Sequence, residues 1–166
     1  MNKLSIGGTF KLECFNASGE LKWSEQLKNG VANAAINSLL DVYFRGSSQI
    51  TSWYIGLIDS VSFTALAASD TMASHGGWIE ATSYTQAARP AWAPGAASSQ
   101  LLVNAATVDF TINTTKTIRG VFISSDSTKG GTSGILFCTA LPSEGDRAVV
   151  NTDALKVTYT LSAQSG

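Results

Sequence analysis

The sequence predicts a mainly β protein, either an antiparallel β-sandwich or a partly open barrel, with an N-terminal β-hairpin and one α-helix at about residues 30–45 packed on it. Two patterns support this fold class. The final third of the chain alternates short strand-like segments with turn-forming residues, and one stretch near residue 30 has helical periodicity. The length of 166 residues suits a single β-rich domain, residues 1–166, from which residues 1–7 could extend as an N-terminal arm.

Five strands are expected in the final third of the chain, over residues 101–103, 106–112, 118–124, 134–141 and 154–162. Two of them alternate apolar and polar residues, so each should turn one face to a core. The apolar positions of these two strands are Val108, Phe110 and Ile112, and Leu155, Val157, Tyr159 and Leu161. Strands at this spacing are typical of a sandwich or barrel, and the loop at residues 126–134 is expected to be a flexible hairpin connection.

The first part of the chain predicts a β-hairpin. Residues 9–15 alternate as a strand should, and residues 20–24 resume the strand pattern. Between them, Asn16-Ala17-Ser18-Gly19 has the asparagine and glycine that supply the positive φ values of a hairpin loop.

An amphipathic helix follows the hairpin, with apolar residues at helical spacing. These residues are Val31, Ala35, Ile36, Leu39, Leu40, Val42 and Phe44. Asn29 is expected to cap the start of the helix, and Gly46, directly after Arg45, should end it. Residues 53–59 are too short and too rich in aromatic and β-branched residues for a second helix, and predict a buried strand. A single helix in such a chain is expected to plug or cover the β core.

The composition favours a subunit of an assembly. The chain is 44% hydrophobic and only 14% charged, well below the usual quarter. With a net charge of −1 and no run of Lys or Arg, it lacks the basic face of a nucleic-acid binder. No stretch approaches the length of a membrane span, and the N-terminal residues lack the apolar run of a signal peptide, so we expect a cytoplasmic protein.

Motifs for catalysis or metal binding are missing from the sequence. Cys14 and Cys138 lie among apolar neighbours and predict two reduced core thiols, and together with His75, the only histidine, they do not make a zinc site. The carboxylates that could serve a glycosidase are Glu80, Asp109, Asp126, Glu144, Asp146 and Asp153. Each lies beside a turn or on a polar strand face, which solvation explains. We therefore expect no catalytic residue, cofactor or metal, and no enzyme.

A resemblance to a known family rests on the stretch from residue 29 to residue 59. Its matching positions are Asn29, Val31, Asn33, Ile36, Asn37, Leu39, Leu40, Asp41, Phe44, Gly46 and residues 53–59. Further similar segments are TQAARPAW at 85–92, IRGVFIS at 118–124 and LKVTYTL at 155–161. In these segments, which span nearly the whole chain, the sequence resembles tailed-bacteriophage virion structural proteins, a family described as virion, capsid-accessory or tail-fibre proteins. The family brings no catalytic residues to this chain.

The resemblance implies a capsid decoration, or cement, protein that binds the shell of major capsid protein and stabilises the head. It implies many copies or a homo-oligomer on the virion surface, made in the bacterial host cytoplasm, with no direct nucleic-acid or membrane contact. Residues 1–7 and 87–99 could extend from the core, so the expected partner contacts are Met1, Asn2, Lys3, Leu4, Arg89, Pro90, Trp92 and Pro94. The alternatives are a phage tail fibre or receptor-binding module and, from another class of protein, a carbohydrate-active β-sandwich enzyme.

Overall fold

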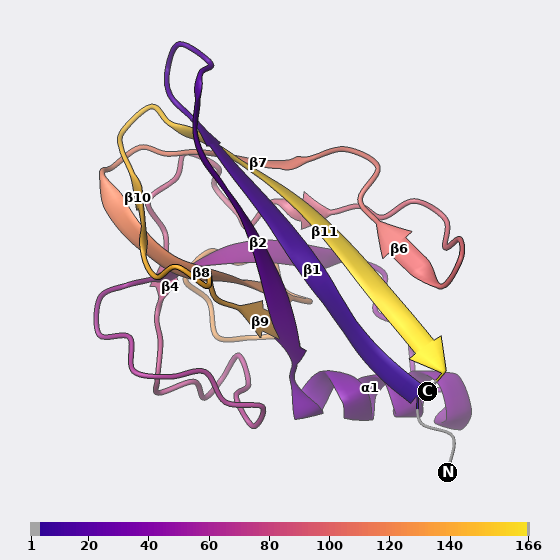
Figure 1. The fold of residues 1–166 in the computed structure, drawn as a ribbon. Helices are drawn as coiled ribbons and strands as arrows, with labels where there is room; N and C mark the ends of the chain where they lie inside the picture. Colours follow the sequence, from indigo (N-terminus) through magenta and orange to yellow (C-terminus); the bar gives the residue numbers. More distant parts are fainter. Residues whose placement is uncertain (1–3, 166) are drawn as a thin grey trace.

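The computed structural model describes residues 4–165, which form an antiparallel sheet of eleven strands with one helix (Figure 1). The elements are β1 (Leu4–Phe15), β2 (Leu21–Val31), α1 (Asn33–Arg45), β3 (Trp53–Asp59), β4 (Glu80–Ala81), β5 (Ala91–Trp92), β6 (Leu101–Val103), β7 (Val108–Thr111), β8 (Lys116–Ser124), β9 (Leu136–Ala140), β10 (Arg147–Val149) and β11 (Ala154–Ser165). The expected hairpin and all five expected C-terminal strands are present. The sequence did not predict β5 and β10.

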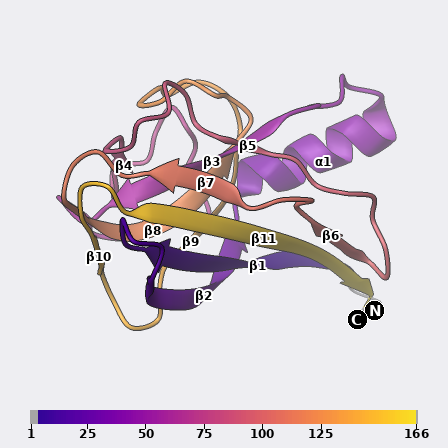
Figure 2. The ribbon, with the colours of Figure 1, turned by 90° about the horizontal axis from the view of Figure 1, so that it is seen from above.

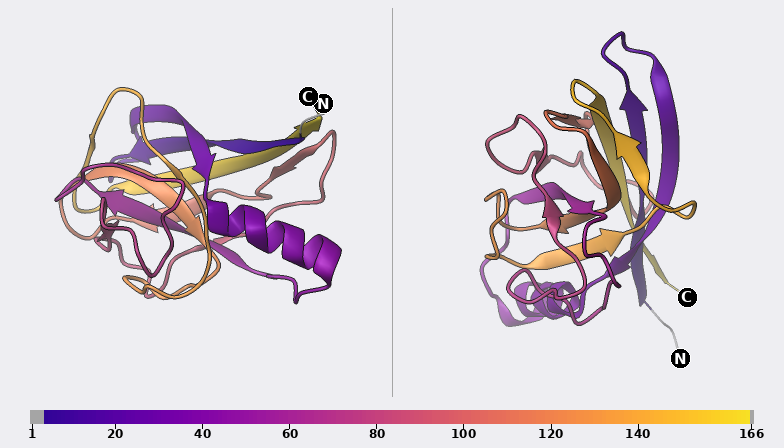
Figure 3. Two further views of the ribbon diagram at one scale, coloured as in Figure 1. Left: turned by 90° about the horizontal axis from the view of Figure 1, so that it is seen from below. Right: turned by 90° about the vertical axis from the view of Figure 1, so that its left-hand side faces the viewer.

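The sheet folds over itself into a sandwich because β2 belongs to both layers. In one layer β11 lies between β1 and the short strands β6 and β7, and β1 pairs with β2 as far as Thr9 opposite Lys28. Residues 29–31 of β2 then pair with β9, which continues through β8 and β3 to form the second layer. The two layers face each other in Figure 3 (right). The sheet is not closed into a barrel, so the mainly β, sandwich-like prediction is confirmed.

The longest pairing in the sheet joins β1 and β11 over their full lengths, from Leu4 opposite Ser165 to Phe15 opposite Ala154. Residues 4–7, expected as part of an arm, therefore belong to the sheet, because β11 continues far enough to pair with them. Residues 1–3 lie outside the described residues. The start of β1 and the end of β11 extend together from the sandwich, in the same direction as α1 (Figure 2).

The main core lies between the two layers, and the predicted alternation is confirmed there. The inward residues of β7 and β11 are buried, from Val108 and Phe110 to Leu155, Val157 and Tyr159. Phe10 of β1 packs on Tyr159 with ring centroids 4.3 Å apart. Cys14 and Cys138 are free thiols within this core, as predicted.

β3 is buried on both faces, as its composition predicted. Its residues Ile55 and Leu57 face the main core. Ile58 joins a second cluster with Trp78 and Phe122, which is formed on the other face of the sheet where part of the segment between β3 and β4 covers it. This second cluster explains why residues 53–59 contain so few polar side chains.

α1 ends as expected but begins later. Gly46 adopts the left-handed conformation, with φ of 71°, and its N–H donates to the Asp41 carbonyl. The start at Asn33 corrects the prediction that Asn29 caps the helix. Asn29 lies in β2 opposite Ala140, because pairing with β9 keeps the chain extended to residue 31. The N-cap is Ala32, whose side chain makes no capping hydrogen bond.

The helix does not plug the core. Ala35 is its only buried residue, whereas the side chains of Tyr43 and Phe44 are 79% and 74% exposed. Figure 2 shows α1 projecting from one end of the sandwich, in the same direction as the ends of β1, β11 and β6. Most of the predicted apolar stripe is therefore left without a covering surface among residues 4–165.

A buried carboxylate ties the start of β11 to the hairpin. The side chain of Asp153 is 1% exposed, and it accepts hydrogen bonds from the Lys22 ammonium at 2.5 Å, the Val150 N–H at 2.8 Å and the Cys14 thiol at 3.5 Å. Burial raises the pKa of Asp153, but the bonds from Lys22 and Val150 outweigh it and hold the pKa below its ordinary value.

This arrangement predicts a loss of stability in acid. A carboxyl whose pKa is lowered in the folded state stabilises the fold above its unfolded pKa of about 3.9, and the stabilisation disappears as the pH falls through the folded value. Wild type should therefore be more stable than the Asp153→Asn variant at pH 7, and this advantage should shrink below about pH 4. Urea unfolding of both proteins across this range measures it. An advantage that is independent of pH would contradict the role given to the charge.

Candidate interaction surface

The most distinctive surface of the molecule is an apolar groove between α1 and the strands beside it, which we call the helix–sheet groove. Two hollows of about 300 and 330 Å³ form it, and Leu39 lines both. The residues that line the groove are Leu4, Ser5, Ile6, Ala35, Ile36, Ser38, Leu39, Leu40, Val42, Tyr43, Gln49, Ile50, Trp53, Phe137 and Leu161. Figure 3 (left) shows α1 and the ends of β1 and β11 extending from the sandwich along the two sides of this region.

The walls of the groove come from segments that are far apart in the sequence. α1 supplies one wall, since its helical spacing sets Ile36, Leu39 and Leu40 on neighbouring turns. The opposite wall is the end of β1 together with Leu161 of β11. The floor includes Trp53 and Phe137, whose rings meet edge to face at a centroid distance of 5.3 Å. The helix contacts β9 of the sandwich.

Among residues 4–165, no charged side chain lines the groove, yet many of its apolar groups are exposed. Leu4 is 65% exposed, and Ile36, Leu39 and Leu40 are each between 40% and 47% exposed. Scattered exposed apolar residues are normal, but a contiguous uncharged patch marks a surface that binds another molecule. The groove offers burial of apolar area and has few polar groups that could orient a small ligand. Its chemistry is that of a protein interface.

Two of the expected contact residues do not lie on the surface. Arg89 is 2% exposed and Trp92 is 6% exposed. Trp92 sits in β5 opposite Trp53, with its ring edge to face against Tyr159 in the main core. These positions correct the prediction that both residues contact a partner, because the segment around them packs onto β3 instead of extending from the core.

Arg89 instead fastens the β8–β9 loop to the sandwich. Its guanidinium donates to both carboxylate oxygens of Glu80, at 3.0 and 2.7 Å, and to the carbonyl oxygens of Asp126 and Gly131, at 2.9 and 2.7 Å. The Gly130 N–H also donates to Glu80 at 2.8 Å. The loop that the sequence predicted to be flexible is thus held by a buried ion pair.

The remaining expected contacts are scattered. Leu4 lines the helix–sheet groove, whereas Pro90 is half-buried and Pro94 is exposed in the segment between β5 and β6. Met1, Asn2 and Lys3 lie outside the described residues. The structure therefore does not gather these residues into one surface, and most of the groove was missed by the sequence reasoning. The exposed helix residues Ile36, Leu39, Leu40 and Phe44 were assigned to the apolar stripe that was expected to cover the core.

The residues considered for chemistry have structural partners. Five of the six candidate carboxylates form ion pairs, each with a different cation. Asp126 accepts from the Thr128 N–H, which lowers its pKa. His75 stacks on Trp78 with centroids 3.9 Å apart. Within residues 4–165, no group of three or more His, Cys, Asp and Glu side chains is arranged to hold a metal ion.

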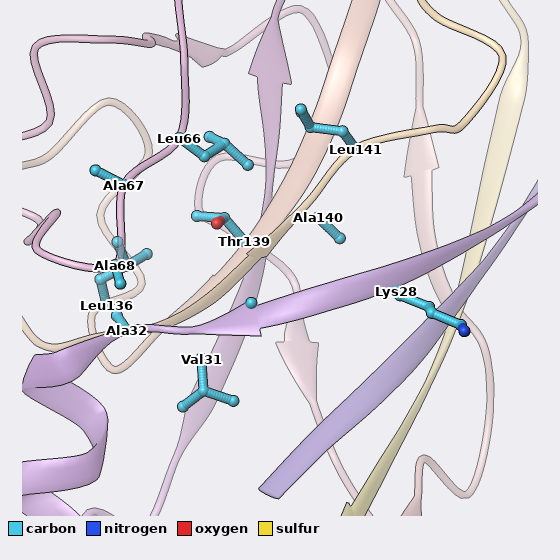
Figure 4. Close-up of a pocket in the computed structure, with 11 residues that line it drawn as sticks. Lys28, Val31, Ala32, Leu66, Ala67, Ala68, Leu136, Thr139, Ala140 and Leu141 are labelled. Carbon is cyan, nitrogen blue, oxygen red and sulfur yellow. The ribbon is translucent and has the colours of Figure 1, made fainter.

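A further hollow, of about 320 Å³, lies outside the groove, beside β2 and β9 and under residues 66–68 (Figure 4). Its labelled side chains carry only one oxygen, from Thr139, and one nitrogen, from Lys28, which points away from the others in Figure 4. Ligand sites usually combine an apolar lining with several convergent polar groups. This hollow lacks them, and we assign it no ligand.

Comparison with known protein families and with curated proteins found no match to this chain. The resemblance to phage virion proteins thus rests on the quoted residues alone. Over the described part of the chain, no helix has both the length and the apolar character needed to cross a membrane.

Proposed function

We propose that the chain is a structural protein of a tailed-bacteriophage particle, specifically a decoration protein that binds the shell of major capsid protein. The observation that carries the proposal is the helix–sheet groove, which no part of residues 4–165 covers and no charged side chain of these residues lines, on an otherwise well-packed sandwich. Residues 29–59, which resemble virion proteins, include the whole of α1. This similarity supports the proposal independently of the groove.

The geometry suits a bracing role. The two long strands β1 and β11 and the helix all project from the same end of the sandwich, so they can dock together as one end of the molecule (Figure 2). A single groove of this size gives modest affinity, since association must offset lost translational and side-chain freedom. Many copies bound at subunit boundaries would add stability to the folded shell by mass action and multivalent contact.

The experiment compares particles with and without the chain. We expect copy number, measured by quantitative mass spectrometry, to scale with the number of shell subunits. Particles that lack the chain should release DNA at lower temperature and after milder osmotic shock than complete particles. A few copies per particle would instead indicate the alternative, a tail fibre or receptor-binding module. Equal resistance of both kinds of particle would contradict bracing.

A further inference from the structure

One edge of β1 is open at the end of the molecule that carries the groove. Residues 4–8 pair with residues 161–165 of β11 on one side. On the other side, pairing with β2 begins only at Thr9, because β2 leaves β1 to join β9. Within the described chain, no strand covers the second edge of residues 4–8. Alternate backbone N–H and C=O groups along this edge are therefore available to another strand.

One of the two hollows of the helix–sheet groove lies next to this open edge. The 330 Å³ hollow is lined by the consecutive residues Leu4, Ser5 and Ile6 and, across from them, by α1. Successive side chains of a strand point to opposite faces of the sheet. Leu4 and Ile6 therefore lie on the same face of β1, which also carries the buried Phe10 and Leu12, and this face and α1 line the hollow beside the open edge. The open backbone edge of residues 4–8 and the apolar helix wall of Ile36, Leu39 and Leu40 thus lie together, and we call this place the slot.

We propose that this slot binds one extended, uncharged segment of a partner protein, which adds as a strand to residues 4–8 of β1 and rests its apolar side chains on Ile36, Leu39 and Leu40. Main-chain hydrogen bonds supply affinity in this mode, and the side-chain surface supplies selectivity. The inference rests on the proposed function in one respect: the segment is assigned to the shell protein.

We assign the slot to a single segment and not to a second copy of the chain. A second copy would offer β1 with β11 already bonded along its other edge, so a two-stranded sheet would have to pass α1. A lone extended segment needs only one strand spacing, about 4.8 Å. The absence of charge among the lining residues of the described chain favours an uncharged segment.

The test uses isotope-labelled chain and a capped peptide of about seven residues, a usual strand length, in which valine alternates with threonine. At peptide concentrations up to about 1 mM, we expect the open-edge amides among residues 4–8 to shift and to exchange hydrogen more slowly, while those facing β11 are already protected. The same peptide with N-methyl groups along one edge should not bind. Unchanged amides at residues 4–8 would overturn the inference. Shifts at these amides that depend on the concentration of the chain itself would show that a second copy of the chain occupies the slot. That result would overturn the assignment to a partner segment.

Matched helix variants separate the slot from the rest of α1. Leu40→Glu puts a charge into the slot, and Asn37→Glu puts the same charge on an exposed helix residue that does not line it. Peptide affinity should fall at least about tenfold in the first variant and stay unchanged in the second. Equal affinities would overturn the inference. If the peptide binds but the chain does not bind to capsid shells, the strand-addition site is supported and the proposed function as a decoration protein is contradicted.

Discussion

Replacing Arg89 by alanine is expected to destabilise the fold by about 3–5 kcal/mol, because it leaves a buried carboxylate without its partner. The guanidinium is fully buried, and the Glu80 side chain is only 7% exposed. The change also removes the donors to the Asp126 and Gly131 carbonyls, so several polar groups lose hydrogen bonds at once. The loop between β8 and β9 should detach before the sandwich unfolds.

Urea unfolding and amide exchange measure both effects. The control is Arg45→Ala, which breaks the exposed Asp41–Arg45 pair one helical turn apart and should cost no more than about 0.5 kcal/mol. If the two variants lost similar stability, or if the amides of residues 126–131 stayed protected in Arg89→Ala, the buried Arg89–Glu80 ion pair would not hold the β8–β9 loop as described.

Replacing Gly56 by alanine is expected to cost about 1–3 kcal/mol by overpacking. Gly56 lies opposite Phe122 in the β3–β8 pair, and a Cβ there would overlap the Phe122 ring. This ring is fully buried against Trp78, with centroids 5.1 Å apart, so it has no free space to move into. The glycine is thus the complement of a large aromatic residue on the neighbouring strand.

Gly30→Ala provides the matched control. Gly30 also lies in a strand, but a Cβ at this position would meet no atom within 4 Å. The substitution should be neutral or stabilise by up to about 1 kcal/mol, through reduced entropy of the unfolded chain. Thermal and urea unfolding of the two variants gives the comparison. Equal stabilities would show that the Phe122 ring adapts and that the packing is looser than described.

Local patterns predicted most of the fold. Alternation in β7 and β11, the turn residues of the hairpin and the glycine after α1 act over a few residues, so the sequence shows them directly. The start of α1 was missed for a non-local reason. Asn29 has the chemistry of a helix cap, but pairing with Ala140 of β9 keeps it in a strand. Tertiary pairing overrode the local preference.

The candidate site was much less predictable. Helical spacing shows that Ile36, Leu39 and Leu40 share a face, and this pattern is the same whether the face packs on the chain's own core or on a partner. The signal that could have separated the two cases is the width of the stripe, which exceeds what one contact with a sheet can cover. The pairing of Glu80 with Arg89 carried no signal, because Glu80 lies in a strand of only two residues and Arg89 in an irregular segment, and neither shows a periodic pattern.

The most direct test of the docking role of the helix–sheet groove is an electron-microscopy map of the phage particle at a resolution that traces the chain. The proposal predicts copies of the sandwich at regular positions on the shell, with α1 and the end of β1 against the major capsid protein. Leu39 and Leu40 should be buried in that contact. Copies confined to the tail, or copies on the shell with α1 facing solvent, would contradict the account.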